Sequence, residues 1–317
     1  MAVIFSHFQT PSITMTLPKA ASCFCRSLFS QSSIYNHHLL YYPIQNPIFN
    51  FNSGWQRVRT RVTSLSEAAS VTDVIRSPNL VALEYSELKL PINCEEVGNI
   101  RVRQHVNPLS TALSVPAEVP DWNDVFKDSS LPLMVDIGCG SGRFLLWLAK
   151  RNIGSNNYLG LEIRKKLVKR SNFWAKELSL SNTHFMFANA TISFQQLASS
   201  YPGPLVLVSI LCPDPHFKKR HHKRRVLQKP LVDSIVDNLT SGGQVFVQSD
   251  VQEVAVDMRN QFDIVPDMLH IDVIDPNYGC DPDGWLLSNP MGIRTEREIH
   301  AELEGAKMYR RLYQKGT

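Results

Sequence analysis

The chain has 317 residues, of which 43% are hydrophobic and 20% are charged, and its formal net charge is +4 at pH 7. The length allows one large α/β domain or two small ones, and the apolar fraction is ordinary for a globular protein with a substantial core. A charge of +4 does not by itself indicate a nucleic-acid-binding protein. No apolar run is long enough to cross a bilayer, since Ile34 to Phe51 is interrupted by Asn, His, Pro and Gln, so we expect no membrane association.

The N-terminal segment differs from the rest of the chain in its charge. No Asp or Glu occurs before Glu67, while the same stretch is rich in Ser and carries four arginines. This acid-free, hydroxyl-rich composition is typical of an organellar transit peptide, and the alternative is a disordered tail. Six cysteines without paired spacing suit a reducing compartment. We therefore expect residues 1–66 to be a disordered transit peptide that directs the protein to the chloroplast, or otherwise to the mitochondrion.

Residues 67–130 form the next predicted region. Thr63 to Ser77 has the composition of a linker or a short helix, and Leu80 to Lys127 mixes short apolar runs with several prolines. We interpret residues 67–130 as a linker and an N-terminal extension that packs on the main domain, which then spans residues 131–317.

Strand-type and helix-type patterns alternate from Leu131 onward. The predicted strands are Leu133 to Ile137, Tyr158 to Ile163, His184 to Ala188, Leu205 to Leu211, Gln244 to Gln248 and Leu269 to Ile274. The predicted helices are Arg143 to Lys150, Lys165 to Leu178, Val226 to Leu239 and Val254 to Phe262, with a turn at Gly242-Gly243. Such alternation predicts an α/β doubly wound fold around a mainly parallel sheet.

The first strand leads into a glycine-rich loop, Asp136-Ile137-Gly138-Cys139-Gly140-Ser141-Gly142, and a helix follows at Arg143. Alternate glycines let the backbone turn sharply and let a ligand approach it closely. The second strand ends at Glu162, where an acidic side chain can accept hydrogen bonds from both hydroxyls of a ribose. At the end of the third strand, Asn189 and Ala190 stand where a polar side chain can reach an adenine edge. Together these features indicate a nucleoside-containing cofactor.

A rarer string follows the fourth strand, from Cys212 to Arg225, and reads CPDPHFKKRHHKRR. With Asp136 to Gly142, Leu159 to Arg164 and Thr295 to Glu298, it resembles the tRNA (guanine-N7)-methyltransferase family, in particular its bacterial branch. The resemblance covers residues from about Leu131 to the C-terminus. It implies a Rossmann-like class I methyltransferase with a seven-stranded sheet, S-adenosylmethionine as the cofactor, and tRNA as the substrate, methylated at guanosine 46 of the variable loop.

The resemblance also assigns residues to roles. Asp214 stands at the catalytic position and, with Asp136, Gly138, Gly140, Glu162, Asn189 and Ala190, at the positions that bind the methyl donor. The resemblance places Lys218, Asp250, Thr295 and Glu298 at substrate-binding positions. We add the neighbouring cations of the basic run, Arg220, Arg224 and Arg225, to the predicted substrate-binding residues. The chain departs from the family pattern at two positions. Cys212 stands where the family commonly has Phe or Ser, and His216 stands where it commonly has Trp. Neither change removes a group that the chemistry requires.

The assigned residues suit methylation at N7. Guanine N7 carries an in-plane lone pair, so it can attack a sulfonium methyl group without first losing a proton. The carboxylate of Asp214 can accept hydrogen bonds from the base and stabilise the positive charge that develops on it. The run from Lys218 to Arg225 contains six cationic side chains that can hold phosphates. A solvated turn at Asp214 and a solvated charged face at the run are the alternative interpretations.

Other functions are compatible with parts of this pattern. A class I methyltransferase acting on another RNA site, a protein or a small molecule would keep the glycine loop and Glu162, but it would not need the segment from Asp214 to Arg225. A catalytically inactive RNA-binding scaffold would keep the basic run and lose the donor-site acids, and both sets are present here. We expect no metal, because His216, His221 and His222 lack a fourth ligand, and we expect the enzyme to act without an obligate protein partner.

Overall fold

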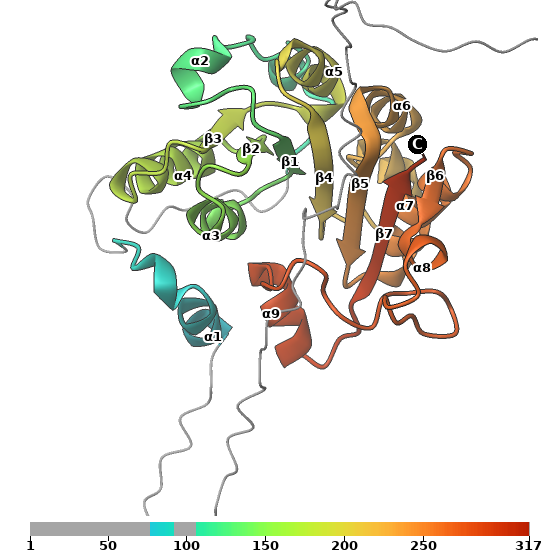
Figure 1. The fold of residues 1–317 in the computed structure, drawn as a ribbon. Helices are drawn as coiled ribbons and strands as arrows, with labels where there is room; N and C mark the ends of the chain where they lie inside the picture. Colours follow the sequence, from blue (N-terminus) through green and yellow to red (C-terminus); the bar gives the residue numbers. More distant parts are fainter. Residues whose placement is uncertain (1–76, 92–105, 317) are drawn as a thin grey trace, which may run out of the picture. The chain divides into compact units, whose positions relative to one another are not determined.

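The computed structural model describes residues 77–91 and 106–316. The predicted transit peptide, residues 1–66, and nearly all of the segment from Thr63 to Ser77 lie outside the described residues. The described chain contains a seven-stranded sheet in the order β3-β2-β1-β4-β5-β7-β6 (Figure 1). The strands are β1 (Leu133–Ile137), β2 (Asn157–Glu162), β3 (Thr183–Phe187), β4 (Leu205–Leu211), β5 (Leu239–Ser249), β6 (Met268–His270) and β7 (Tyr309–Lys315).

The strand directions confirm the predicted fold class. Strands β1 to β5 pair with their neighbours in parallel, whereas β7 is antiparallel to both β5 and β6. The parallel strands therefore place their carboxyl ends at one edge of the sheet. In open α/β sheets this edge is where ligands bind.

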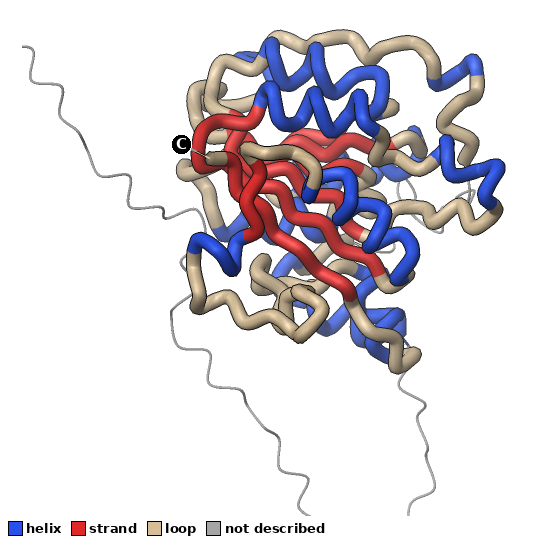
Figure 2. The backbone as a smooth tube through the Cα atoms, turned by 90° about the vertical axis from the view of Figure 1, so that its right-hand side faces the viewer, coloured by secondary structure: helices blue, strands red, loops and turns tan. Residues whose placement is uncertain are grey.

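Helices cover both faces of the sheet (Figure 2). The α-helices are α1 (Ser77–Glu84), α2 (Trp122–Val125), α3 (Arg143–Arg151), α4 (Lys165–Glu177), α5 (Ala190–Ser200), α6 (Lys229–Asn238), α7 (Gln252–Asp263), α8 (Ile271–Ile274) and α9 (Glu296–Leu303). Side chains of α2, α5, α6 and α7 form one core with Val135, and those of α1, α3, α4 and α9 form another with Met134. Adjacent residues of β1 thus serve opposite cores, because side chains alternate along a strand.

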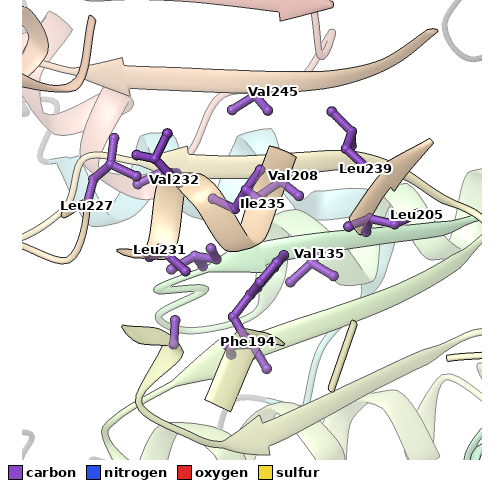
Figure 3. Packing of buried hydrophobic residues seen from close by; sticks show 14 of the residues in the cluster. Val135, Phe194, Leu205, Val208, Leu227, Leu231, Val232, Ile235, Leu239 and Val245 are labelled. Carbon is purple, nitrogen blue, oxygen red and sulfur yellow. The ribbon is translucent and has the colours of Figure 1, made fainter. Parts of the chain in front are cut away.

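The first of these cores is packed from strands and helices that are far apart in sequence. Figure 3 shows Val135, Val208 and Val245 from the central strands facing Phe194 of α5 and Ile235 of α6. All five side chains are at most 1% exposed. Burial of each contributes about 1.5–3 kcal/mol. This core fixes β1 and β4, the two strands that carry the glycine loop and the loop of Asp214.

Three predicted elements differ from the observed ones. The run from Leu269 to Ile274, predicted as one strand, is the short strand β6 followed by the helix α8. A short apolar run does not distinguish a strand from a buried helix by periodicity alone. The pair Gly242-Gly243, predicted as a turn, lies within β5 where the pairing with β4 shifts in register, as at a β-bulge. The helix predicted from Val226 begins at Lys229, followed by Pro230, which is favoured in a first helical turn.

The described parts of the N-terminal extension contact the main domain through hydrogen bonds and ion pairs. The Tyr85 hydroxyl donates to the carbonyl oxygen of Arg294, and the Arg294 guanidinium pairs with Glu84 at 2.6 Å. Asn189 donates from Nδ2 to the carbonyl oxygen of Pro108 at 3.0 Å. None of the helices in the described ranges has both the length and the apolar character needed to cross a membrane.

Candidate donor and base-binding site

The glycine loop after β1 forms the floor of the candidate site. Gly138, Gly140 and Gly142 all have positive φ, at 81°, 56° and 76°. Residues with a Cβ adopt this backbone conformation only at a cost in free energy. A Cβ at Gly142 would lie 2.6 Å from Ser171 Oγ, whereas a Cβ at Gly138 would meet no heavy atom within 4 Å. Gly142 is therefore required for packing against α4. The open space at Gly138 leaves room for a ligand above the loop.

Glu162 ends β2 and is bonded to that loop. Its Oε2 accepts a hydrogen bond from the Gly140 backbone N–H at 3.0 Å, and its Oε1 accepts one from the Arg164 N–H at 2.9 Å. The side chain is only 1% exposed. Burial raises the pKa of Glu162, and the neighbouring Arg164 guanidinium opposes this shift. A buried acid beside an open glycine loop fits the predicted role of holding ribose hydroxyls.

Asp136 lies under the same loop, near the end of β1. It is buried and accepts a hydrogen bond from the Ser209 hydroxyl at 2.6 Å. Burial raises the pKa of Asp136 to about 7; the Ser209 hydrogen bond opposes this rise and the nearby Glu162 charge adds to it. The Asp136 carboxyl, in the wall of a cleft that the glycine loop also lines, therefore holds its proton to a higher pH than an exposed Asp does.

Asn189 caps α5, with its Oδ1 accepting from the Thr191 N–H at 3.3 Å. Its Nδ2 donates to the carbonyl oxygens of Pro108 and Leu113, both at 3.0 Å. Both hydrogens of this amide therefore bind the N-terminal extension, and the predicted contact of Asn189 with an adenine edge stays a prediction. Ala190, the first residue of α5, lines the cleft beside Asn189.

Asp214 lies in the loop that leaves β4, on the same edge of the sheet. Its Oδ2 pairs with Arg164 Nη2 at 3.3 Å, and the side chain is about one-third exposed. The residues on either side of the Pro213-Asp214-Pro215 segment, Cys212 and His216, both have positive φ, at 49° and 46°. Such backbone conformations cost on the order of 1–3 kcal/mol each in non-glycine residues and cluster at functional sites.

Two adjoining clefts border these residues, and Gly138, Arg164 and Cys212 contribute to both. The first has a volume of about 120 Å³ and contains Glu162, Asn189, Ala190, Asp214 and Arg224 in its walls. The second has a volume of about 230 Å³ and contains Asp136, Gly140, Ser141, Thr295 and Glu296. The structure thus brings every predicted donor-site residue to the walls of two neighbouring clefts, which we call the groove, at the carboxyl ends of the strands.

The predicted basic surface divides into exposed and buried parts. Lys218, Lys219, Arg220 and Lys223 are exposed, in and beside the 3-10 helix η3 (Lys219–Arg224). Arg224 lines the first cleft. Arg225 is only 6% exposed and pairs with Glu253 at 2.7 Å and Asp257 at 3.1 Å. This environment does not fit the predicted contact of Arg225 with a phosphate. A guanidinium that is buried between two carboxylates cannot reach a phosphate.

The string from Thr295 to Glu298 has a structural role that the substrate assignment did not include. Thr295 caps α9, and Glu298 completes a capping box with it. Glu298 is fully buried and accepts from Arg310 Nη2 at 2.6 Å and from Gln248 Nε2 at 3.0 Å. Its predicted substrate contact is therefore not observed, because the side chain points into the protein.

Asp250, another predicted substrate residue, is 8% exposed in its side chain and accepts from Arg297 Nε at 3.0 Å. It joins the end of β5 to the start of α9. Thr295, by contrast, lies on the wall of the second cleft. Of the predicted substrate residues, the structure leaves Lys218, Arg220, Arg224 and Thr295 accessible.

Two sets of contacts in the groove could not be predicted from the sequence. Glu296 accepts hydrogen bonds from the Ser141 hydroxyl and from Arg143 Nη1, the latter at 2.7 Å, and so joins α9 to the glycine loop. Arg164 links Glu162 to Asp214. The capping pattern Thr-x-x-Glu could have indicated that Glu298 faces its own backbone, but no pattern in the sequence indicates the contacts of Glu296 and Arg164.

The strand order, the glycine loop after β1 and the acid at the end of β2 are those of a class I methyltransferase. Residues 130–310 match the model of the family described as "Putative methyltransferase". The chain belongs to the tRNA (guanine-N7)-methyltransferase family, because curated members of it are more than 40% identical over most of their length.

Three relatives illustrate this similarity. The tRNA (guanine-N(7)-)-methyltransferase of Synechococcus sp. (strain JA-2-3B'a(2-13)) is 48% identical over 62% of this chain and 77% of its own length. The enzyme of the same name from Synechococcus elongatus is 43% identical over 68% of this chain and 97% of its own. That of Synechocystis sp. (strain ATCC 27184 / PCC 6803 / Kazusa) is 41% identical over 69% of this chain and 99% of its own.

Proposed function

We propose that the protein transfers a methyl group from S-adenosylmethionine to N7 of a guanine in tRNA. The observation that carries this proposal is the meeting of the glycine loop, Glu162 and Asp214 in one groove, with exposed cations directly beyond Asp214. The relatives named above bear the same activity in their names. Guanosine 46 of the variable loop is the proposed nucleotide.

The donor would lie along the glycine loop. Glu162 would accept from the ribose hydroxyls, and the open space at Gly138 would let the donor approach the backbone. When bound, S-adenosylmethionine supplies an electrophilic methyl group on a sulfonium. Asp136, which lies on β1 just before the loop, would be protonated or negatively charged according to the pH.

The chain's contribution to catalysis is placement and charge. N7 needs no base, so the rate depends on in-line positioning, an effect that can contribute about 7–11 kcal/mol. Asp214 would accept from the base edge and stabilise the positive charge that develops on the purine. The exposed Lys218, Arg220 and Lys223, with Arg224 at the cleft, would hold phosphates and fix the register of the tRNA.

The experiment that tests this function is the methylation of unmodified tRNA by the purified protein with S-adenosylmethionine. The expected product is 7-methylguanosine at position 46, mapped by borohydride-induced cleavage. A tRNA with adenosine at position 46 should accept no methyl group. Methylation of the two tRNAs at equal rates would contradict the proposed site, and no methylation of either would contradict the activity.

We also propose that the enzyme works in the chloroplast, or otherwise in the mitochondrion, without an obligate protein partner. The absence of Asp and Glu before Glu67 supports the proposed location. A fluorescent protein fused behind residues 1–77 should enter plastids. A diffuse cytosolic signal would contradict the proposed location. If the methylation assay required added cell extract, the proposal that the enzyme needs no protein partner would be wrong.

A further inference from the structure

Arg164 lies between the two carboxylates to which the proposed function gives separate tasks. Its Nη1 is 3.2 Å from Glu162 Oε1, and its Nη2 is 3.3 Å from Asp214 Oδ2. Glu162 ends β2 and Asp214 follows β4, and the two strands are separated by β1 in the sheet. The Arg164 guanidinium therefore forms a direct link across the groove between the predicted ribose-binding acid and the predicted catalytic acid.

The binding capacity of Glu162 makes this link sensitive to a ligand. A carboxylate offers about four lone-pair sites. Glu162 already accepts from the backbone N–H groups of Gly140 and Arg164, at 3.0 and 2.9 Å, in addition to Arg164 Nη1. Two ribose hydroxyls that donate to Glu162 would have to share its remaining sites with Nη1. The backbone bonds are fixed by the fold, so the side-chain bond is the one that yields.

We infer that Arg164 is a positioning residue that couples donor binding to the orientation of Asp214. With a ribose on Glu162, the guanidinium loses part of its hold on that acid and is held by Asp214 instead. Asp214 is then fixed by a charge-assisted hydrogen bond at the time when the base must be placed. The loop needs such a partner, because it lies between two residues in strained backbone conformations, Cys212 and His216.

This inference rests on the proposed donor and predicts a specific pattern of binding. Removing the Asp214 charge leaves Glu162 as the stronger partner of Arg164, so the guanidinium competes more strongly with the ribose. Asp214→Asn should therefore weaken binding of S-adenosylhomocysteine by about three- to tenfold, a coupling ordinary for residues of one network. In an Arg164→Gln background the same change should have no effect. S-adenosylhomocysteine is the suitable probe, because its uncharged thioether removes any direct attraction of a sulfonium to Asp214.

The test is calorimetry on the full chain in four forms: wild type, Arg164→Gln, Asp214→Asn and the double variant, each checked by thermal unfolding. A non-additive cycle supports the coupling. An equal effect of Asp214→Asn in both backgrounds, or none in either, overturns it and leaves the proposed donor intact. Failure of the wild type to bind S-adenosylhomocysteine overturns the donor assignment as well.

Arg164→Lys provides a second variant that keeps the charge but cannot span two acids with one planar group. We expect its kcat to fall about 100-fold, the size of effect that misplacing a catalytic group by 1 Å can produce, while its KM for tRNA stays within twofold. A higher KM for tRNA and a lower melting temperature with unchanged kcat would assign Arg164 a merely structural role and overturn the inference.

Discussion

Arg225 donates a hydrogen bond from Nε to the carbonyl oxygen of Pro215 at 3.0 Å. The same guanidinium pairs with Glu253 and Asp257, both on α7. The residue next to Asp214 is thus fastened to a helix by a buried arginine. The end of the basic run supports the catalytic loop, while the exposed cations before it face solvent.

Arg225→Gln should lower kcat more than it weakens tRNA binding. It leaves the Pro215 carbonyl without its donor, which costs about 1–3 kcal/mol, and lets the Asp214 loop move. We expect a lower melting temperature, a kcat reduced at least tenfold and a tRNA Kd within threefold of wild type. Filter binding and single-turnover methylation on one preparation check this. A large loss of tRNA affinity with normal kcat would restore a phosphate contact to Arg225.

Lys218→Gln combined with Arg220→Gln should have the opposite profile. These exposed side chains are proposed to hold phosphates, so their removal should weaken tRNA binding and reduce the slope of log K against log salt by about 0.7–0.9 for each phosphate that is no longer neutralised. Binding of S-adenosylhomocysteine should not change. The matched control is Lys229→Gln, an exposed lysine that pairs with Asp233 on α6. An unchanged salt slope in the double variant would contradict the proposed surface.

Asp214→Asn should reduce methyl transfer by at least about 100-fold, the loss typical when one group that stabilises transition-state charge is removed. The tRNA affinity should be nearly unchanged, since a surface that binds through cations loses no attraction when an acid is neutralised. Product formation under single-turnover conditions, with tRNA binding measured in parallel, decides this. Wild-type turnover in the variant would remove Asp214 from the catalytic role.

Gly142→Ala should destabilise the fold more than Gly138→Ala does. Both changes place a Cβ on a backbone with positive φ, at a cost of about 1–2 kcal/mol. At Gly142 the new methyl group would also lie 2.6 Å from Ser171 Oγ and 2.8 Å from Phe185, and such overpacking costs about 1–3 kcal/mol more. Urea unfolding of the two variants measures the difference. Equal midpoints would show that α4 moves away freely.

Glu298→Gln should lower stability by about 3–5 kcal/mol, because it leaves Arg310 buried with a weaker partner. Glu302→Gln is the control, since Glu302 contacts the same arginine at 3.3 Å but is about one-third exposed and should cost less than about 1 kcal/mol. Both variants should bind tRNA normally when folded. Weakened tRNA binding by folded Glu298→Gln would support the substrate contact that the structure does not show.

Asp136→Asn should stabilise the protein at high pH only. Burial raises the pKa of Asp136 to about 7, so the folded state holds this proton more tightly than the unfolded chain, whose Asp titrates near 3.9. The wild type therefore loses stability as the pH rises from about 4 to 7, a loss on the order of a few kcal/mol that Asn avoids. The gain of the variant in melting temperature should be largest above pH 7 and disappear near pH 4. Asp128→Asn is the control, because hydrogen bonds from Ser130 lower the pKa of Asp128. A gain that is independent of pH would contradict the raised pKa.

The parallel half of the sheet could be predicted from the sequence because each of its strands carries a local signal. Leu205–Leu211 is continuously apolar, as a strand covered on both faces must be. No such signal marks β7, since Tyr309–Lys315 reads YRRLYQK, without strict alternation and with Arg, Arg, Gln and Lys among its seven residues. Its pairing comes from β5 and β6, which are distant from it in sequence. Similarly, β6 and α8 divide one apolar run at His270, a boundary set by tertiary contacts.

The site residues were predictable where position along a strand determines their environment. Glu162 is the last residue of β2 and Asp214 follows the end of β4, so the topology alone brings them to the groove. Glu298 and Arg225 could not be placed in this way, because both are ionic side chains whose partners, Arg310 and Asp257, come from other elements. Composition indicates that such groups are exposed, and only the packed structure shows that they are paired and buried.

The position of β7 in the sheet affects how this chain can fold during synthesis. In the described residues β6 pairs only with β7, and β7 also supplies the outer neighbour of β5. Strands β1 to β5 can assemble with their helices as they leave the ribosome, but β6 has no partner until Lys315 has been translated. At about 5–20 residues per second, the interval from His270 to Lys315 lasts several seconds. Until β7 is added, the outer edge of β5 presents unpaired backbone N–H and C=O groups, the feature of a sheet that can pair with another chain.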